Sequence, residues 1–177
     1  MKRVVVGLFL ALVFLACVPV CGVAEEKPVQ LSLFTPIQIF PEETSITVFR
    51  FNLIYGSNAT MTGLDLGLVN RTTSGVSKAF QIGLVNWVDA DLVGLQWGPI
   101  NMVDNDFTGF QSGTVNVVMN DFKGFQWGFF NYSNHANGLQ LGFINYTETA
   151  YGLQIGLINI IREGGFLPFF PIVNWSF

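Results

Sequence analysis

Residues 138–159, GLQLGFINYTETAYGLQIGLIN, contain the eight-residue unit Gly-Leu-Gln-x-Gly-φ-Ile-Asn twice, where φ stands for an apolar residue. The two copies are fourteen residues apart, which indicates a repeated structural element. Units of the same kind end at Asn70, Asn86, Asn101, Asn116, Asn131, Asn145 and Asn159, with spacings of 16, 15, 15, 15, 14 and 14 residues. A degenerate eighth unit, FFPIVN, ends at Asn174.

A period of about fifteen residues fits one strand and one turn, because repeats built from helix pairs need about 33 residues or more. Large apolar residues alternate with Gly and Gln in each unit, which predicts a strand with one apolar face and one Gly/Gln face. Asp- and Asn-rich segments such as 89–91 and 104–106 are typical of turns. Two more strands are predicted over 31–40 and 46–55, which brings the total to ten.

Two all-β architectures satisfy this pattern. We favour an up-and-down antiparallel meander closed into a barrel of about ten strands, with the Leu/Ile/Trp/Phe face toward lipid and the Gly/Gln face inside a narrow lumen. The alternative is a parallel β-solenoid of coils of about 15 residues, in which Gln and Asn would form ladders. One detail fits the repeat poorly: Trp175 and Phe177 share the parity of the Gly/Gln face, unless a bulge at Pro168 or Pro171 shifts the last strand.

The two architectures respond differently to substitution. In the barrel, Leu in place of Gly142 or Gly156 would overpack the lumen. Asp in place of Leu141 or Ile155 would block membrane insertion. In a solenoid with its Leu face inward, the Asp substitutions would instead unfold a soluble protein.

The first residues resemble an export signal. Met1-Lys2-Arg3 precedes an apolar run over 4–20, and Gly22-Val23-Ala24 supplies small residues before a cut. We expect a signal peptide over 1–24 and a single repeat-built domain over 25–177, with an N-terminal strand pair over 25–56 and the repeats and terminal strand over 57–177. The alternatives are lipidation at Cys17 or Cys21, or a retained membrane helix.

Composition limits the class of partner. Half of the 177 residues are apolar and 11% are charged, against roughly 25% in typical soluble domains. Without Lys2 and Arg3, six Lys and Arg face twelve Asp and Glu, a net charge of −6. Nucleic acid is therefore not expected as a partner. A membrane that covers apolar surface is expected, and no small-molecule or protein partner is identified.

No motif for catalysis, cofactor binding or metal binding is present, and we assign no residue to such a role. His135 lies in a Ser-Asn-His turn and is read as a solvent-exposed turn residue. Asp65 stands at a Gln position and is expected to form a structural salt bridge with Arg50 or Arg71. Carboxylates that could in principle hold Ca²⁺, but are read as ordinary turn residues, are Asp89, Asp91, Asp104, Asp106 and Asp121.

In its GLQxGxxN units the chain resembles a family of uncharacterised bacterial surface-repeat-containing proteins. The resemblance extends to the leader and to the segments LSLFTPIQ at 31–38, NLIYG at 52–56 and LPFFPIVN at 167–174. The units depart from the pattern at Asp65, Ala79 and Pro99. The resemblance implies an envelope location and brings no activity and no site residue.

These observations together predict a non-enzymatic, exported protein of the cell envelope, outer-membrane-associated and with a structural or surface role. The alternative is a secreted, periplasmic or surface-tethered β-solenoid that acts as a binding or adhesion module.

Overall fold

The computed structural model describes residues 25–177. The predicted signal peptide, including Cys17 and Cys21, lies outside these residues. The strands are β1 (Glu26–Phe34), β2 (Ile37–Gln38), β3 (Ser45–Asn58), β4 (Thr62–Thr72), β5 (Val76–Ile82), β6 (Val85–Val88), β7 (Asp91–Trp97), β8 (Ile100–Val103), β9 (Phe107–Glu163) and β10 (Phe169–Ser176).

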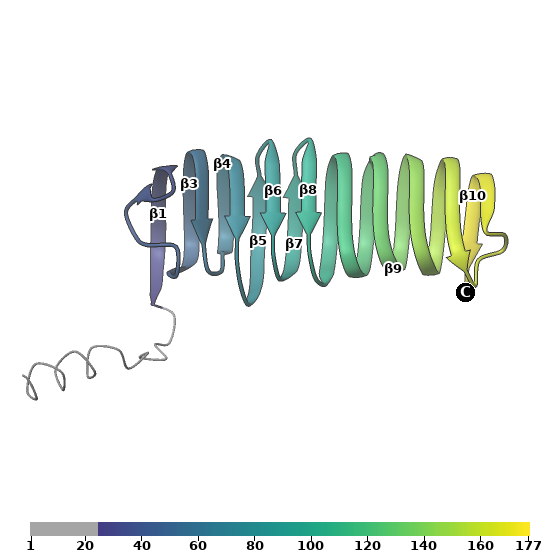
Figure 1. The fold of residues 1–177 in the computed structure, drawn as a ribbon, viewed down its shortest axis with the longest axis horizontal. Coiled ribbons are helices and arrows are strands. Elements are labelled where there is room, and N and C mark those ends of the chain that lie inside the picture. Colours follow the sequence, from purple (N-terminus) through teal and green to yellow (C-terminus); the bar gives the residue numbers. More distant parts are fainter. Residues whose placement is uncertain (1–24) are drawn as a thin grey trace, which may run out of the picture.

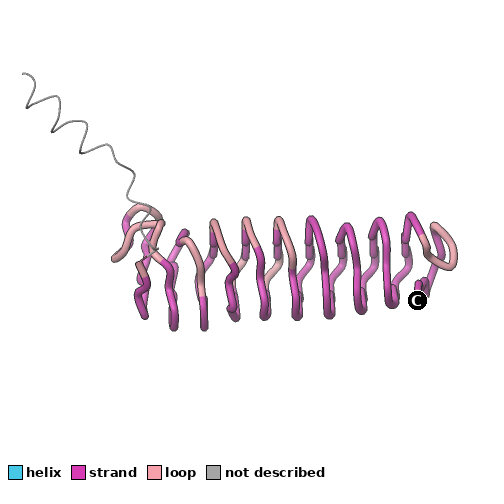
Figure 2. Tube along the Cα trace, turned by 90° about the horizontal axis from the view of Figure 1, so that it is seen from below, coloured by secondary structure: helices cyan, strands magenta, loops and turns pink. Residues whose placement is uncertain are grey.

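Consecutive repeat units run parallel and in register. Gln81 pairs with Gln96 and Gln96 with Gln111, while Asn86 pairs with Asn101 in the same way. The chain therefore winds as a stack of flattened coils (Figures 1 and 2). The predicted antiparallel meander and barrel are wrong, and the alternative, a parallel β-solenoid, is correct. The reason is that the turns between units bend the chain around the coil and do not reverse it into an antiparallel neighbour.

Each coil has two walls of unequal length. The long wall has seven residues, as in β5 and β7, and the short wall has four, as in β6 and β8. One corner is formed by Gly98-Pro99 and its equivalents, and we call it the apolar corner. The other is formed by residues 104–106 and their equivalents, and we call it the polar corner. The later coils have the same walls within the continuous strand β9 (Figure 1).

The interior of the stack is lined by amides. Gln111 Nε2 donates to Gln96 Oε1 at 2.7 Å, and Gln126 Nε2 donates to Gln111 Oε1 at 2.8 Å. Gln126 Nε2 also lies 3.3 Å from the carbonyl oxygen of Tyr132, on the short wall of the same coil. The Gln side chain therefore crosses the interior, which is about one side chain thick. Gln therefore faces inward, as predicted for the barrel, and forms a ladder with its equivalents, as predicted for the solenoid.

A second ladder is formed by the Asn residues that end the units. Asn116 Nδ2 donates to Asn131 Oδ1 at 2.8 Å and to the carbonyl oxygen of Trp127, on the long wall of the next coil, at 3.0 Å. The second glycine of each unit leaves the space that this Asn occupies. A Cβ built on Gly142 would lie 2.4 Å from the carbonyl oxygen of Gly128 and 2.5 Å from Asn131 Nδ2. The second glycine and the Asn three residues later are therefore both needed at the corner, because the Asn side chain of one coil occupies the space beside the glycine of the next.

The apolar core is a narrow column beside the amide ladders. Phe107 and Phe122 stack with ring centroids 6.2 Å apart, and Val103 and Val118 face them from the short wall. Because the Gln and Asn amides occupy the rest of the interior, most of the large apolar side chains point outward. This arrangement agrees with the expected Gly/Gln interior but excludes a solenoid with its Leu face inward.

The two ends of the stack are closed differently. At the N-terminal end β1 pairs parallel with β3, and β2 folds back antiparallel on β1. At the C-terminal end β10 runs antiparallel to the last turn of β9, with Asn174 opposite Gln154. The FFPIVN segment is therefore a cap and not an eighth coil. Because its strand runs antiparallel to β9, Trp175 need not follow the inward and outward alternation of the repeat units. The register shifts between Phe170 and Ile172, at the predicted bulge around Pro171.

Candidate functional surfaces

The outer surface of the solenoid is unusually apolar along one corner. Trp97 is 61% exposed and Trp127 is 55% exposed, and both lie at the same repeat position on the long wall. The exposed apolar residues of the corner and the wall positions beside it form a strip that we call the apolar ridge, which Ser112 and Thr114 interrupt in one coil. Its members are Leu68, Ile82, Leu84, Trp97, Ile100, Trp127, Phe129, Phe143 and Leu157.

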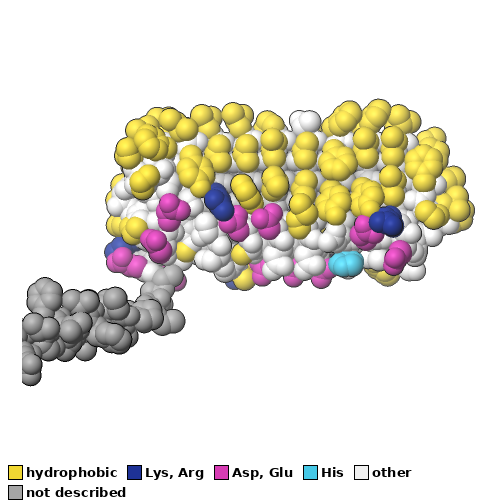
Figure 3. Space-filling model, viewed as in Figure 1, with side chains coloured by type: hydrophobic (Ala, Val, Ile, Leu, Met, Phe, Trp, Pro, Cys, Tyr) yellow, Lys and Arg dark blue, Asp and Glu magenta, His cyan; other side chains and the backbone are white. Residues whose placement is uncertain are grey.

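The ridge lies opposite the polar corner. Figure 3 shows hydrophobic side chains over the upper part of one face of the stack, while Asp, Glu and His side chains gather toward its lower border. Single exposed apolar residues are ordinary, but a strip with exposed apolar residues in most of its coils is typical of a surface that contacts a partner. The solenoid is therefore amphipathic across its section, with an apolar corner and a polar corner.

The polar corner forms a ladder of its own. The Asp91 carboxylate accepts hydrogen bonds from Asn105 Nδ2 and from the backbone N–H of Asp106. The Asp106 carboxylate accepts from Asn120 Nδ2 at 2.6 Å and from the backbone N–H of Asp121 at 3.2 Å. In the predicted meander these acidic turns would lie at opposite ends of the strands, whereas the parallel coil stacks them on one edge. Within residues 25–177, no cluster of three or more His, Cys, Asp or Glu side chains could hold a metal ion.

The expected salt bridge of Asp65 forms with Arg50. Arg50 Nη2 lies 2.6 Å from Asp65 Oδ2 and Arg50 Nε lies 2.8 Å from Asp65 Oδ1, with both side chains fully buried. Arg71 instead pairs with Asp89 at the surface and lies over the Trp87 ring, 4.7 Å from its centroid. Its hydrogen bond to Asp89 raises the pKa of Arg71 above its ordinary value.

Two tyrosines lie on the outer face of the short wall, near the polar corner. Tyr132 and Tyr146 stack with ring centroids 5.4 Å apart, and their hydroxyls donate to Asn134 Oδ1 at 2.7 Å and Glu148 Oε1 at 2.6 Å. The hydrogen bond to the Glu148 carboxylate raises the pKa of Tyr146. Each ring thus has an apolar neighbour on one side and a polar partner at its tip.

The remaining sequence-predicted residue, His135, is exposed in its turn and its Nδ1 lies 2.7 Å from Thr149 Oγ1. No helix in the described part of the chain has the length and apolar character needed to cross a membrane. Comparison with models of known protein families, with curated proteins and with solved structures found no match.

The separation of an apolar corner from a polar corner was not predicted from the sequence. Alternation assigns residues to an inner and an outer face, but it does not say which outer residues gather on one edge of a coil. A signal was present nonetheless. The turn contains Asp or Asn after four of the seven unit-ending residues, namely Asn86, Asn101, Asn116 and Asn131. The residue after the second glycine is apolar in six of the seven units, with Thr114 in the other.

Proposed function

We propose that this protein is a non-enzymatic, exported β-solenoid of the cell envelope that binds a lipid surface through its apolar ridge. The observation that supports this proposal best is that polar side chains fill the interior while large apolar side chains are exposed, the reverse of an ordinary soluble domain. Amide ladders occupy the interior, while Trp97, Trp127 and Phe129 are exposed at one corner.

Burial of the ridge in lipid would remove apolar surface from water at about 25 cal/mol per Å². Because the coils are equivalent, the ridge is a straight strip along the stack, and a fluid leaflet can follow such a strip without a matching shape. The polar corner would remain in water. Interfacial proteins are arranged in this way, with an apolar face in the boundary between headgroups and acyl chains.

Tyr132 and Tyr146 support the same orientation, because amphipathic aromatic rings are favoured where an apolar surface meets a wet one. The net charge of −6 for residues 25–177 argues against attraction to anionic lipid. Binding should therefore be driven by apolar burial and depend little on salt.

Flotation with vesicles of zwitterionic phosphatidylcholine tests this proposal. The purified protein should float with the vesicles, and Trp127→Glu or Phe129→Glu should reduce the floated fraction severalfold, because a charge would have to enter the acyl region. Ser74→Glu, at an exposed position outside the ridge, is the matched control and should float like the parent protein.

Failure of the parent protein to float would overturn the lipid proposal. If the protein instead formed a stable dimer that Trp127→Glu dissolved, the ridge would be an interface between two copies.

A further inference from the structure

The coils narrow by one residue part-way along the stack. The spacing between unit ends falls from 15 to 14 residues after Asn131. The coil that ends at Asn145 is one residue shorter in the polar corner. Two residues, Asn134-His135, stand there in place of the three residues Met119-Asn120-Asp121 of the coil before. The interior narrows at the same place: Ala136 follows Phe122 in the core column, and Ser133 follows Val118.

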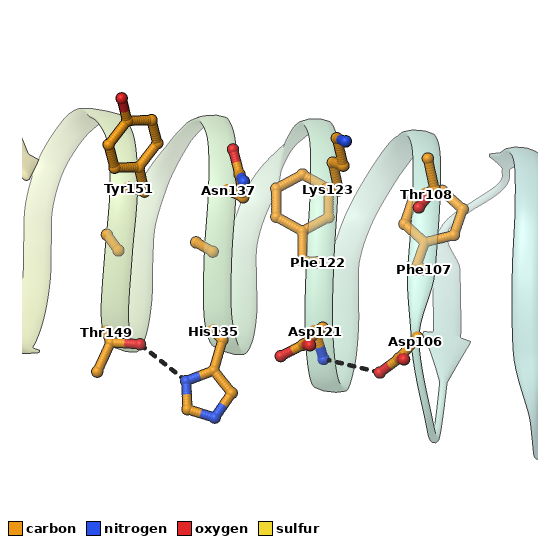
Figure 4. Close-up of a pocket in the computed structure, with 12 residues that line it drawn as sticks. Asp106, Phe107, Thr108, Asp121, Phe122, Lys123, His135, Asn137, Thr149 and Tyr151 are labelled. Carbon is orange, nitrogen blue, oxygen red and sulfur yellow. Dashed lines mark hydrogen bonds between the residues drawn. The ribbon is translucent and has the colours of Figure 1, made fainter. Parts of the chain in front are cut away.

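A groove of about 490 Å³ lies where the wide coils meet the narrow ones (Figure 4). Two rows of side chains border it, and the inward-pointing residues Phe122, Ala136 and Ala150 lie between them. One row consists of Asp121, His135 and Thr149, and the other of Lys123, Asn137 and Tyr151. Neighbours in a row are one coil apart, about 4.8 Å.

The side chains of the groove differ from those of the rest of the polar corner in their bonding. Elsewhere the corner residues bond one another, as Asn105 bonds Asp91. Figure 4 marks two hydrogen bonds among the lining residues, from the Asp121 backbone N–H to Asp106 and between His135 and Thr149. The side chains of Asp121, Lys123, Asn137 and Tyr151 take part in neither. In Figure 4 the side chains of Lys123, Asn137 and Tyr151 point away from the row of Asp121, His135 and Thr149, so the two rows form opposite rims of the groove and their free hydrogen-bonding groups lie at these rims.

The chemistry of the lining selects the class of ligand. The carboxylates of Asp106 and Asp121 would repel an anionic ligand, and the ammonium group of Lys123 would repel a cationic one. Carboxylate, amide, hydroxyl and ammonium groups together supply both acceptors and donors, as a ligand with several hydroxyl groups requires. The Tyr151 ring packs against Phe177, with centroids 6.1 Å apart, but is still 62% exposed, and its exposed surface can contact the apolar side of such a ligand.

We propose that this groove binds an uncharged, extended saccharide, with one sugar ring against Tyr151 and its hydroxyl groups bonded to Asn137 and Asp121. The two rows run straight along the stack, so an extended β-linked chain follows them and a coiled α-linked chain does not. The volume falls within the range of ligand sites, about 300–1,000 Å³. The groove lies at the polar corner, away from the apolar ridge, and its use does not depend on lipid binding.

Calorimetric titration of the purified protein with cellopentaose, a β-linked glucan, tests the proposal. We expect binding that Tyr151→Ala and Asn137→Ala each weaken about tenfold, which corresponds to about 1.4 kcal/mol. Tyr151→Phe keeps the ring and should retain most of the affinity. Glu163→Ala and Phe129→Ala, both outside the groove, are the controls and should bind like the parent protein.

Circular dichroism of each variant checks that the coil is intact. Absence of binding to cellopentaose at millimolar concentration would overturn the proposal, as would binding that Tyr151→Ala leaves unchanged. Equal affinity for maltopentaose would refute an extended ligand, and tighter binding of an oligogalacturonate would refute an uncharged one.

Discussion

Asp65 accepts two hydrogen bonds from the buried Arg50 guanidinium and a third, at 2.9 Å, from Gln81 Nε2. A carboxylate can only accept, so Gln81 must present its Nε2 to Asp65 and leave its Oε1 for Gln96. The same choice is then imposed on each Gln of the ladder up to Gln154, and each of them donates toward the N-terminal end. The Asn ladder runs in the opposite direction, from Asn52 toward Asn159. Asp65 therefore sets the polarity of a ladder that extends through the whole stack.

Neutralising Asp65 should be strongly destabilising. Asp65→Gln restores the repeat pattern but leaves the Arg50 guanidinium buried without its counter-ion, and the free energy of unfolding should fall by about 3–5 kcal/mol. The double substitution of Asp65→Gln with Arg50→Met should recover most of that loss. Urea unfolding of the two single variants and the double variant measures the coupling, and additive effects would contradict this account.

Interrupting the Gln ladder in the middle should be costly although the new side chain is apolar. Gln111→Leu leaves Gln126 Nε2 and Gln96 Oε1 without their ladder partners, and each unsatisfied buried group costs about 1–3 kcal/mol. Trp97→Leu, on the outer face one coil earlier, should change stability by less than about 0.5 kcal/mol. Urea denaturation compares the two, and the idea fails if Gln111→Leu is as mild as Trp97→Leu.

Neighbouring positions on opposite faces of one strand should respond differently. Gly142→Ala places a Cβ against the Gly128 carbonyl and the Asn131 amide, and should lower the free energy of unfolding by at least about 2 kcal/mol. Leu141 points outward, so the Leu141→Asp variant should stay folded. A solenoid with its Leu face inward would instead be unfolded by this substitution. Circular dichroism and urea titration distinguish the two. Unfolding by Leu141→Asp would show that the outer face is packed.

Removing the C-terminal cap should cause end-to-end association. Deletion of residues 164–177 removes β10 and exposes the edge of the last coil, whose backbone groups can pair with another chain. Light scattering should show larger, concentration-dependent species for the shortened chain than for the full one. A shortened chain whose size equals that of the full chain at all concentrations would show that the edge is protected by other means.

Much of the wall structure could be predicted from the sequence. The recurrence of Gln96, Gln111 and Gln126 at fifteen residues, with apolar residues between glycines, predicted strands, turns and a Gly/Gln face turned inward. These features depend on the period-two alternation of side chains along a strand, which is local. The groove had a local signal as well, because the change in spacing after Asn131 is visible in the printed sequence.

The path of the chain was decided only by the tertiary structure. Alternation is the same in an antiparallel hairpin and in a parallel coil, and Asp or Asn turns such as 104–106 suit both. The choice depends on contacts between residues about fifteen apart. Gln111 can donate to Gln96, and Asn116 can fill the space beside glycine, only when units stack parallel and in register. The same long-range geometry turned the segment around Asn174 into a cap and aligned Trp97 and Trp127 along one corner, because parallel coils stack equivalent positions over one another.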